Sequence, residues 1–323
     1  MGAPGKDGQR DGREEQGNSL TDVHGSPYVR IGASVLTDVS VGDDDPVGLD
    51  RAHELLDAGD GRRLERFGAR VVDRPAPAAT GPRLQPDAWD EADLRFERER
   101  GWESRGAPVE PWTVDADGLT LELRPTEAGQ VGWFPEHAAL WPWLRGAVAA
   151  PPGAEVLHLF GYTGATSLVL ARAGARVTHV DASRPAVAWA RRNAELSGLA
   201  DAPIRWIVDD AASFLRREAR RGRRYGGLVL DPPSFGHGGP GRRWELEAGI
   251  DDLLEACVAI AEPDAFVLLT AHTTGWDGRR LSVALERTSE QRIARLDSGE
   301  LRLDAQSGAV LSLGAFARLE LAA

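Results

Sequence analysis

The pattern of apolar and polar positions changes twice along the chain. From about residue 154 onward, short apolar runs alternate with amphipathic stretches such as 184–197, which ends before Gly198 and predicts a helix. Strands separated by helices need right-handed crossovers, so we predict a doubly wound, mostly parallel α/β sheet. Two more strands around Ser307-Gly308, within 299–321, bring the sheet to seven. The apolar runs that predict its first five strands are 154–160, 175–181, 203–208, 226–231 and 264–270.

The region before residue 137 has a different pattern, with short strand-like runs and no alternating helices. The runs 64–67 and 69–72 predict short strands, and Asp117-Gly118 is a strong hairpin signal between the runs 112–114 and 119–123. We therefore predict a small, antiparallel, β-rich domain over residues 59–136. The catalytic domain follows over 137–323 and begins with a helix, 137–148, that Pro142 must kink or interrupt.

Residues 1–58 show little periodicity, and the run Asp43-Asp44-Asp45 would repel itself in any compact form. We predict a disordered acidic tail. The whole chain of 323 residues has a net charge of −12, but thirteen acidic and five basic residues fall within 1–60. The remainder is only mildly acidic, which argues against salt-driven wrapping of nucleic acid and still permits a local basic surface.

The composition narrows the class of protein further. No stretch approaches the apolar length needed to span a bilayer, and residues 1–16 lack the apolar centre of a secretory signal. We therefore expect a cytoplasmic protein without a membrane partner. Cys257 is the single cysteine, which excludes an intramolecular disulfide and a cysteine-based metal cluster, and we expect no metal.

Candidate chemistry gathers where predicted strands end. The loop Gly161-Tyr162-Thr163-Gly164 can present backbone N–H groups to a ligand, although two glycines also occur in such turns for steric reasons alone. It lacks the third glycine and the Gly-x-Gly opening of a dinucleotide fingerprint, which argues against a nicotinamide or flavin enzyme. Asp181, at the end of the next strand, can bind a ribose diol or cap the following helix.

Two further strand ends carry carboxylates. Asp210 can accept from the amine of an adenine or can simply stabilise a helix start. Asp231-Pro232-Pro233 holds an extended acceptor cluster that suits an amino or ring N–H group, and Phe235 offers a face for stacking a base. A purely structural turn is the alternative for the proline pair.

Taken together, these motifs resemble a known family. His158-Leu-Phe-Gly-Tyr-Thr-Gly164, Val180-Asp-Ala-Ser183, Asp209-Asp-Ala211 and Asp231-Pro-Pro-Ser-Phe235 look like the class I S-adenosylmethionine-dependent methyltransferases. The set is most similar to the branch of large-subunit ribosomal-RNA cytosine-C5 and guanine-N7 methyltransferases. The likeness includes Gly132-Trp-Phe-Pro-Glu-His137 and covers about residues 61–320.

The resemblance implies a Rossmann-like fold, S-adenosyl-L-methionine as cofactor and a division of the site. Asp231, Pro232, Pro233 and Phe235 would serve catalysis and face the substrate. The residues implied in cofactor binding are Phe134, Glu136, Phe160, Gly161, Tyr162, Thr163, Gly164, Asp181, Ala182, Ser183, Asp209, Asp210 and Ala211.

The chain departs from the branch at two places. His137 stands where relatives have glutamine, and Thr270-Ala271-His272-Thr273-Thr274 carries no thiol where the cytosine-C5 enzymes have their cysteine nucleophile. Cys257 falls in a predicted helix, 253–261, where a lone cysteine is typically a small buried hydrophobe. We therefore reject C5-cytosine chemistry. His272 can act as a base or serve the structure alone.

The basic and aromatic residues do not decide which substrate the protein binds. The arginines of 216–224 should lie at the amino ends of the strands, opposite the cofactor, and end a helix there. Arg242-Arg243-Trp244 can grip a substrate or lie in a solvated loop. Trp89, Trp102, Trp112 and Trp133 can stack bases or fill a core, which we favour.

These observations predict a methyltransferase that acts on a nitrogen of an RNA base, in ribosomal RNA and its processing, by direct in-line transfer. Two alternatives stay open. One is a methyltransferase of a small molecule or natural product, favoured by the acidic charge. The other is a cofactor-binding protein without transfer activity, against which the Asp231-Pro232-Pro233 motif argues.

Overall fold

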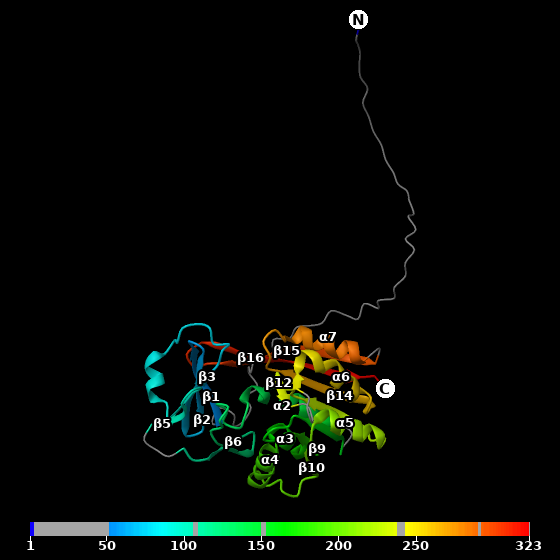
Figure 1. Cartoon of the computed structure of the whole chain (residues 1–323), viewed down its shortest axis with the longest axis horizontal. Helices are drawn as coiled ribbons and strands as arrows, with labels where there is room; N and C mark the ends of the chain where they lie inside the picture. Colours follow the sequence, from blue (N-terminus) through cyan, green and yellow to red (C-terminus); the bar gives the residue numbers. More distant parts are fainter. Residues whose placement is uncertain (3–51, 106–108, 150–152, 238–242, 290–291, 323) are drawn as a thin grey trace. The chain divides into compact units, whose positions relative to one another are not determined.

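The computed structural model describes residues 1–2, 52–105, 109–149, 153–237, 243–289 and 292–322 (Figure 1). Most of the predicted tail, 3–51, lies outside the described residues. Its last part does not fit the prediction, because strand β1 (His53–Gly59) begins within it. Leu55 and Ala58 of this strand are buried, so burial of its apolar side chains holds it in the fold.

A seven-stranded sheet carries the larger part of the fold, in the order β10-β9-β8-β11-β14-β16-β15. The first five strands are parallel, and β16 runs antiparallel to both of its neighbours. The doubly wound, mostly parallel sheet is therefore confirmed. Its strands are β8 (Glu155–Leu159), β9 (Arg176–Asp181), β10 (Ile204–Val208), β11 (Tyr225–Leu230), β14 (Ala261–Ala271), β15 (Ile293–Asp304) and β16 (Val310–Leu321).

Helices cover both faces of this sheet. Val156 of β8 belongs to one hydrophobic cluster and Leu157 to another, because neighbouring side chains of a strand point to opposite faces. The first cluster takes residues from α2 (Trp141–Val148), α3 (Ala165–Arg172) and α4 (Arg184–Leu196). The second takes residues from α5 (Ala211–Arg220), α6 (Leu246–Val258) and α7 (Gly278–Ser289).

Two predicted helices have different bounds in the structure. The helix predicted at 137–148 is a 3-10 helix, η2 (Pro135–Leu140), followed by α2, and Pro142 lies in the first turn of α2. Proline is well suited to that turn, where its missing N–H costs no helical hydrogen bond. The helix predicted at 253–261 is also wrong at its end, because α6 stops at Val258 and β14 begins at Ala261.

The amino-terminal region contains a second sheet of five strands in the order β1 to β5. It is mixed rather than antiparallel as predicted, because β3 and β4 pair in parallel. The 3-10 helix η1 (Pro86–Glu91) lies in the crossover between them. The proline-rich sequence of this segment did not predict the crossover. The other strands are β2 (Arg62–Phe67), β3 (Arg70–Pro75), β4 (Leu94–Glu97) and β5 (Gly101–Ser104).

The predicted hairpin at Asp117-Gly118 is present as β6 (Trp112–Ala116) and β7 (Leu119–Leu123). It packs on α4 rather than extending the five-stranded sheet. Trp189 Nε1 donates to the Glu122 carbonyl at 2.9 Å, and the Glu122 N–H donates to Asn193 Oδ1 at 2.8 Å. One hydrophobic cluster joins residues from both sides of position 136, so the domain boundary there stays a prediction.

The carboxy-terminal hairpin of β15 and β16 links the two sheets. At the turn of this hairpin, the Gln306 N–H donates to the Leu55 carbonyl at 2.9 Å and the Ser307 N–H donates to the Leu56 carbonyl at 3.1 Å. Both carbonyls belong to β1. The sequence predicted the hairpin but not this contact. None of the helices in the described part of the chain has the length and apolarity that a bilayer-spanning helix requires.

Candidate active site

The carboxyl ends of parallel strands meet at one edge of the central sheet, and a cavity of about 670 Å³ opens there. This volume lies within the roughly 300–1,000 Å³ of typical ligand sites. The described residues that line it are Gln130, Phe134, Phe160, Tyr162, Asp181, Ala182, Ser183, Asp210, Ala211, Ala212, Asp231, Pro232, Pro233, Ser234, Gly236, Trp244, Leu253 and His272.

The loop after β8 has an unusual backbone. Phe160 and Tyr162 have φ values of 58° and 47°, a left-handed conformation that bulky residues rarely adopt. A Cβ at Gly161 would lie 2.4 Å from the His179 ring, so the loop also requires glycine there. The Tyr162 N–H donates to Asp181 Oδ2 at 2.9 Å, which ties the strained loop to the end of β9.

Asp181 is positioned by backbone groups. Besides the Tyr162 N–H, its carboxylate accepts the Ser183 N–H at 2.8 Å. Burial raises the pKa of Asp181, and these two hydrogen bonds oppose that rise. Ser183, whose hydroxyl accepts from Ala186 N, is the N-cap of α4, so the capping alternative for Asp181 is wrong. The carboxylate is therefore available to a ligand in the cavity.

The two neighbouring aspartates that follow β10 differ in whether they line the cavity. Asp210 caps α5 by accepting the Ser213 N–H at 2.9 Å and also lines the cavity, so both interpretations of this residue are compatible with its position. Asp209 forms an ion pair with Arg217 and accepts the Asp210 N–H. It is not among the residues that line the cavity, so it supports its neighbour from outside.

Asp231 is held by three side chains from two other segments, the end of β14 and the 3-10 helix η2. Thr270 Oγ1 donates to its Oδ1 at 2.6 Å. His272 Nε2 lies 3.5 Å from Oδ1 and His137 Nε2 lies 3.9 Å from Oδ2. Burial works to raise the pKa of Asp231, but the two imidazoles and the Thr270 hydroxyl hold it below its ordinary value, so the group is a carboxylate at neutral pH.

The wall beyond Asp231 differs from the prediction. Phe235 is 64% exposed and is not among the cavity-lining residues, so its stacking role stays a prediction. The indole of Trp244 lies in the wall instead, on a short hairpin formed by β12 (Phe235–His237) and β13 (Arg243–Glu245). Its Nε1 donates to the Pro233 carbonyl at 2.8 Å. The sequence predicted that this carbonyl is free to accept from a substrate, but Trp244 already occupies it.

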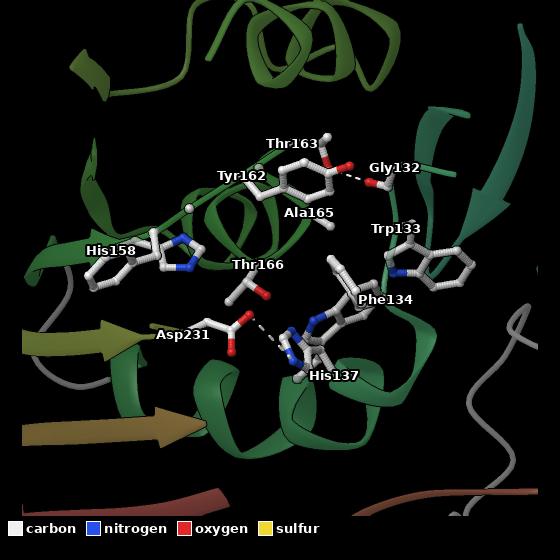
Figure 2. A pocket seen from close by; sticks show the side chains of 14 residues that line it. Gly132, Trp133, Phe134, His137, His158, Tyr162, Thr163, Ala165, Thr166 and Asp231 are labelled. Atoms are coloured by element: carbon white, nitrogen blue, oxygen red, sulfur yellow. Dashed lines mark hydrogen bonds and ion pairs between the residues drawn. The ribbon is translucent and has the colours of Figure 1, made fainter. Parts of the chain in front are cut away.

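The segment 132–137 crosses the site. Thr163 Oγ1 donates to the Gly132 carbonyl, and the Phe134 ring lies 5.7 Å from that of Tyr162, centroid to centroid. Figure 2 shows these residues around a small adjoining pocket, in which the Asp231 carboxylate faces the imidazole of His137. The segment therefore connects the loop after β8 with the acceptor side of the site.

A second cavity, of about 610 Å³, adjoins the first. Gln130, Phe134 and His272 line both cavities. Glu136 lines only the second, where its Oε2 is buried and has no hydrogen-bond partner among the described residues. Its predicted cofactor contact is therefore not supported by its position.

Most of the predicted site residues come together. Phe134, Phe160, Tyr162, Asp181, Ala182, Ser183, Asp210, Ala211, Asp231, Pro232 and Pro233 line the main cavity, and Gly161, Thr163 and Gly164 line the small pocket. Asp209, Glu136 and Phe235 do not line either of these two. The sequence reasoning missed Gln130, Ala212, Ser234, Gly236 and Leu253, which carry no chemical signal in the sequence.

The basic stretches fall in different places. Arg223 pairs with Glu155 at the start of β8, and Arg224 donates to the carbonyls of Ala259 and Ala261 at the start of β14. Arg223 and Arg224 thus lie at the amino ends of the strands, as predicted, whereas Arg217 of the same run pairs with Asp209 just after the carboxyl end of β10. Arg242 lies outside the described residues. The four tryptophans of the amino-terminal region are buried or packed against the core, which favours the packing interpretation.

Comparison with solved structures identifies the family. No protein-family model matches the chain. The crystal structure of an S-adenosylmethionine-dependent methyltransferase from Agrobacterium tumefaciens is 39% identical to it, with a TM-score of 0.79 over 83% of this chain and 90% of that one. The chain belongs to the S-adenosylmethionine-dependent methyltransferases.

More distant relatives agree on the fold or match one part of the chain. A methyltransferase structure in complex with S-adenosylhomocysteine is 16% identical, with a TM-score of 0.66 over 83% of this chain and 75% of that one. The ribosomal RNA large subunit methyltransferase I of Aeromonas salmonicida is 28% identical over 155 residues, 46% of this chain. The match spans only 38% of that relative's length.

Proposed function

We propose that this protein transfers a methyl group from S-adenosylmethionine to a nitrogen of an RNA base, in ribosomal RNA, by direct in-line displacement in the cytoplasm. The observation that carries the proposal is the meeting of three strand ends on one cavity. Asp181, Asp210 and the Asp231-Pro232-Pro233 segment all line it.

The cofactor side of the cavity suits an adenosyl sulfonium. Asp181 presents a carboxylate that can accept from the ribose diol, and Asp210 can accept from the adenine amine while it caps α5. The rings of Phe134 and Tyr162 form a face that can attract a cation. Burial raises the pKa of Tyr162 to about 12, so this phenol is neutral. When bound, S-adenosylmethionine supplies an electrophilic methyl group.

The acceptor side needs no covalent catalysis. Asp231 can accept a hydrogen bond from an amino or ring N–H group and hold the nitrogen lone pair in line with the methyl group. Cys257 cannot serve as a nucleophile, because it is buried in α6 outside the cavity wall and burial raises its pKa. This supports nitrogen rather than cytosine-C5 as the target.

The comparison with a ribosomal RNA large subunit methyltransferase supports RNA as substrate. To test this, we would isolate RNA from a strain lacking the gene and from its parent, and analyse nucleosides by mass spectrometry. We expect one methylated base to disappear from the large-subunit RNA, and the purified protein with labelled S-adenosylmethionine to restore it. An unchanged nucleoside profile, with no label transferred in vitro, refutes an RNA substrate.

One observation favours the small-molecule alternative. Three aspartates and no arginine or lysine occur among the described residues that line the main cavity. Such a wall does not by itself attract a phosphate backbone. The same labelled cofactor, offered with a protein-free extract of small metabolites, separates the two functions: label in that fraction and not in RNA favours the alternative.

A further inference from the structure

We propose that His137 and His272 act as one unit that takes up the proton released by the methyl acceptor. The acceptor is then a group that carries a proton, such as an exocyclic amine or a ring N–H, and not a ring nitrogen with a free lone pair. This inference rests on the proposed function and narrows its substrate class.

Hydrogen bonding fixes where His272 can hold a proton. Its Nδ1 lies 2.7 Å from the Leu313 carbonyl, which can only accept, so Nδ1 carries a hydrogen. In the neutral ring Nε2 is therefore the lone-pair nitrogen. It lies 2.9 Å from His137 Nε2, which must then donate the hydrogen between the two rings. A proton added to this pair can be shared across that bond.

The charges around the pair favour one added proton and disfavour a second. Burial opposes charge on both rings. For His272 the carboxylates of Asp231 and Glu136 and the Leu313 carbonyl outweigh burial and the charge of Arg63, and raise its pKa. For His137, burial and the positive charge of His272 outweigh the two carboxylates and lower its pKa. His158, which also faces Asp231, is held neutral by burial.

The two histidines border all three spaces of the site. His272 lines the main cavity and the second cavity, and His137 lines the small pocket beside Asp231 (Figure 2). The side chains of His137, His272 and Asp231 are 15%, 27% and 21% exposed, so each is partly accessible from these spaces. An acceptor entering through the second cavity would meet His272 before it reached the cofactor side.

The methyl transfer replaces the acceptor N–H bond with a nitrogen–carbon bond. The acceptor N–H donates to Asp231, and the nitrogen lone pair forms a bond to the methyl carbon while the carbon–sulfur pair stays on sulfur. The N–H bond breaks, and its proton passes to the Asp231 carboxylate and on to His272 Nε2, 3.5 Å away. Because that lone pair otherwise accepts the His137 N–H, His137 gives up its Nε2 hydrogen, takes one at Nδ1 and accepts the new His272 N–H. A base of this kind contributes typically 10²–10⁴-fold to a rate.

The same three side chains offer ligand atoms for a metal ion, all within 4.8 Å of one another. The separation of the two Nε2 atoms distinguishes the roles. Ligands of a tetrahedral zinc ion, at about 2.0–2.1 Å from the metal, lie about 3.3 Å apart. The observed 2.9 Å is a hydrogen-bond distance, and the Nδ1 bond to Leu313 orients His272 for it.

The first test is a titration of the full chain with ¹⁵N-labelled histidine, bound to S-adenosylhomocysteine, by NMR from pH 5 to pH 9. We expect His272 Nδ1 to stay protonated throughout, its Nε2 to titrate above the ordinary histidine range, and His137→Gln to shift that titration. Independent titration of the two rings, or a neutral His272 without a hydrogen on Nδ1, overturns the proposal. So does binding of added Zn²⁺ that displaces the hydrogen between the rings.

The second test measures methyl transfer to RNA from the deletion strain as a function of pH. His272→Asn keeps a donor near Leu313 but cannot titrate. We expect kcat to fall by about 10²–10⁴-fold, the acidic limb of the pH profile to vanish, and cofactor affinity to persist. His137→Gln, which keeps a side-chain amide beside His272, should move the limb with a smaller loss of rate.

The outcomes are separable. A wild-type rate and an unchanged acidic limb in His272→Asn refute the proton-uptake role while leaving RNA methylation intact. If the wild-type protein transfers no label to RNA, the proposed function fails, and the NMR titration still decides whether the two imidazoles share one proton.

Discussion

The two sides of the cavity are built in different ways. On the cofactor side, Asp181 is held by the N–H groups of Tyr162 and Ser183, and Asp210 by that of Ser213, so backbone groups fix these carboxylates. On the acceptor side, Asp231 is held by side chains from other segments, at Thr270, His137 and His272.

This difference has a chemical consequence. Backbone N–H groups do not titrate, so the groups that position the cofactor-side carboxylates stay the same over a wide pH range. Imidazoles do titrate, so the acceptor side can change its protonation during a reaction. Under the proposed function, this division lets one side hold the cofactor while the other takes up a proton from the methyl acceptor.

The largest effect should come from the acceptor carboxylate. Asp231→Ala removes the hydrogen-bond acceptor for the substrate and should lower kcat by about 10²–10⁴-fold, with S-adenosylhomocysteine affinity retained. Calorimetry for binding and label transfer for activity test this directly. Asp251→Ala, in an exposed ion pair with Arg287, is the matched control and should leave both unchanged. Lost binding with activity intact per bound cofactor would contradict the assignment.

On the cofactor side the reverse pattern is expected. Asp181→Asn weakens a charged acceptor, and since each such hydrogen bond contributes about 1.5–3 kcal/mol, S-adenosylhomocysteine affinity should fall by about 10–100-fold. The rate at saturating cofactor should change little. Titration calorimetry measures the loss, with the exposed Asp201→Asn as control. A drop in kcat with normal affinity would show that the two sides are not separate.

His158, which is buried next to the loop after β8, should make the stability of the fold depend on pH. The acceptor pair, His137 and His272, should not. Burial lowers the pKa of His158 to about 4, and its Nδ1 is hydrogen-bonded to Ser167 Oγ at 2.7 Å. The unfolded chain, with an ordinary pKa near 6.5, binds a proton that the folded protein does not. Stability is therefore complete above about pH 6.5 and falls as the pH decreases towards 4.

Between pH 7 and pH 5 this histidine should cost about 2 kcal/mol in the free energy of unfolding. Urea denaturation at several pH values measures the slope, and His158→Asn, which keeps a polar atom near Ser167, should reduce it. The acceptor pair should titrate without unfolding the protein. A slope unchanged in His158→Asn assigns the acid sensitivity to other groups.

The smallest effect should come from the indole in the acceptor wall. Trp244→Phe keeps a ring but removes the donor to the Pro233 carbonyl, a bond that contributes about 1 kcal/mol. We expect about a fivefold rise in KM for the acceptor and no change in cofactor affinity, both from initial rates. Trp276→Phe, at the second cavity, separates a loss specific to Trp244 from a general loss of aromatic surface. Equal effects of the two substitutions would remove the special role of Trp244.

The cofactor side could be predicted from the sequence because its causes are local. Each strand, the turn after it and the next helix follow one another in the chain, so apolar runs ending at Gly161, Asp181 and Asp210 already specify a shared edge of a parallel sheet. Two residues predicted on this side, Glu136 and Asp209, do not line the main cavity. Elsewhere the prediction was wrong at element ends, such as that of α6, where one helical turn more or less changes the apolar pattern very little.

The acceptor side was decided by tertiary structure. His137 and His272 are 135 positions apart, and no spacing rule indicates that their Nε2 atoms share a hydrogen bond. Trp244 enters the wall through a hairpin that the sequence did not reveal, and it lines the cavity where Phe235 was expected to do so. The sequence by itself determined the sheet, the cofactor edge and the absence of a usable thiol. The packing of distant segments decided which side chains face the acceptor, because such contacts depend on where the whole chain folds back rather than on neighbours in sequence.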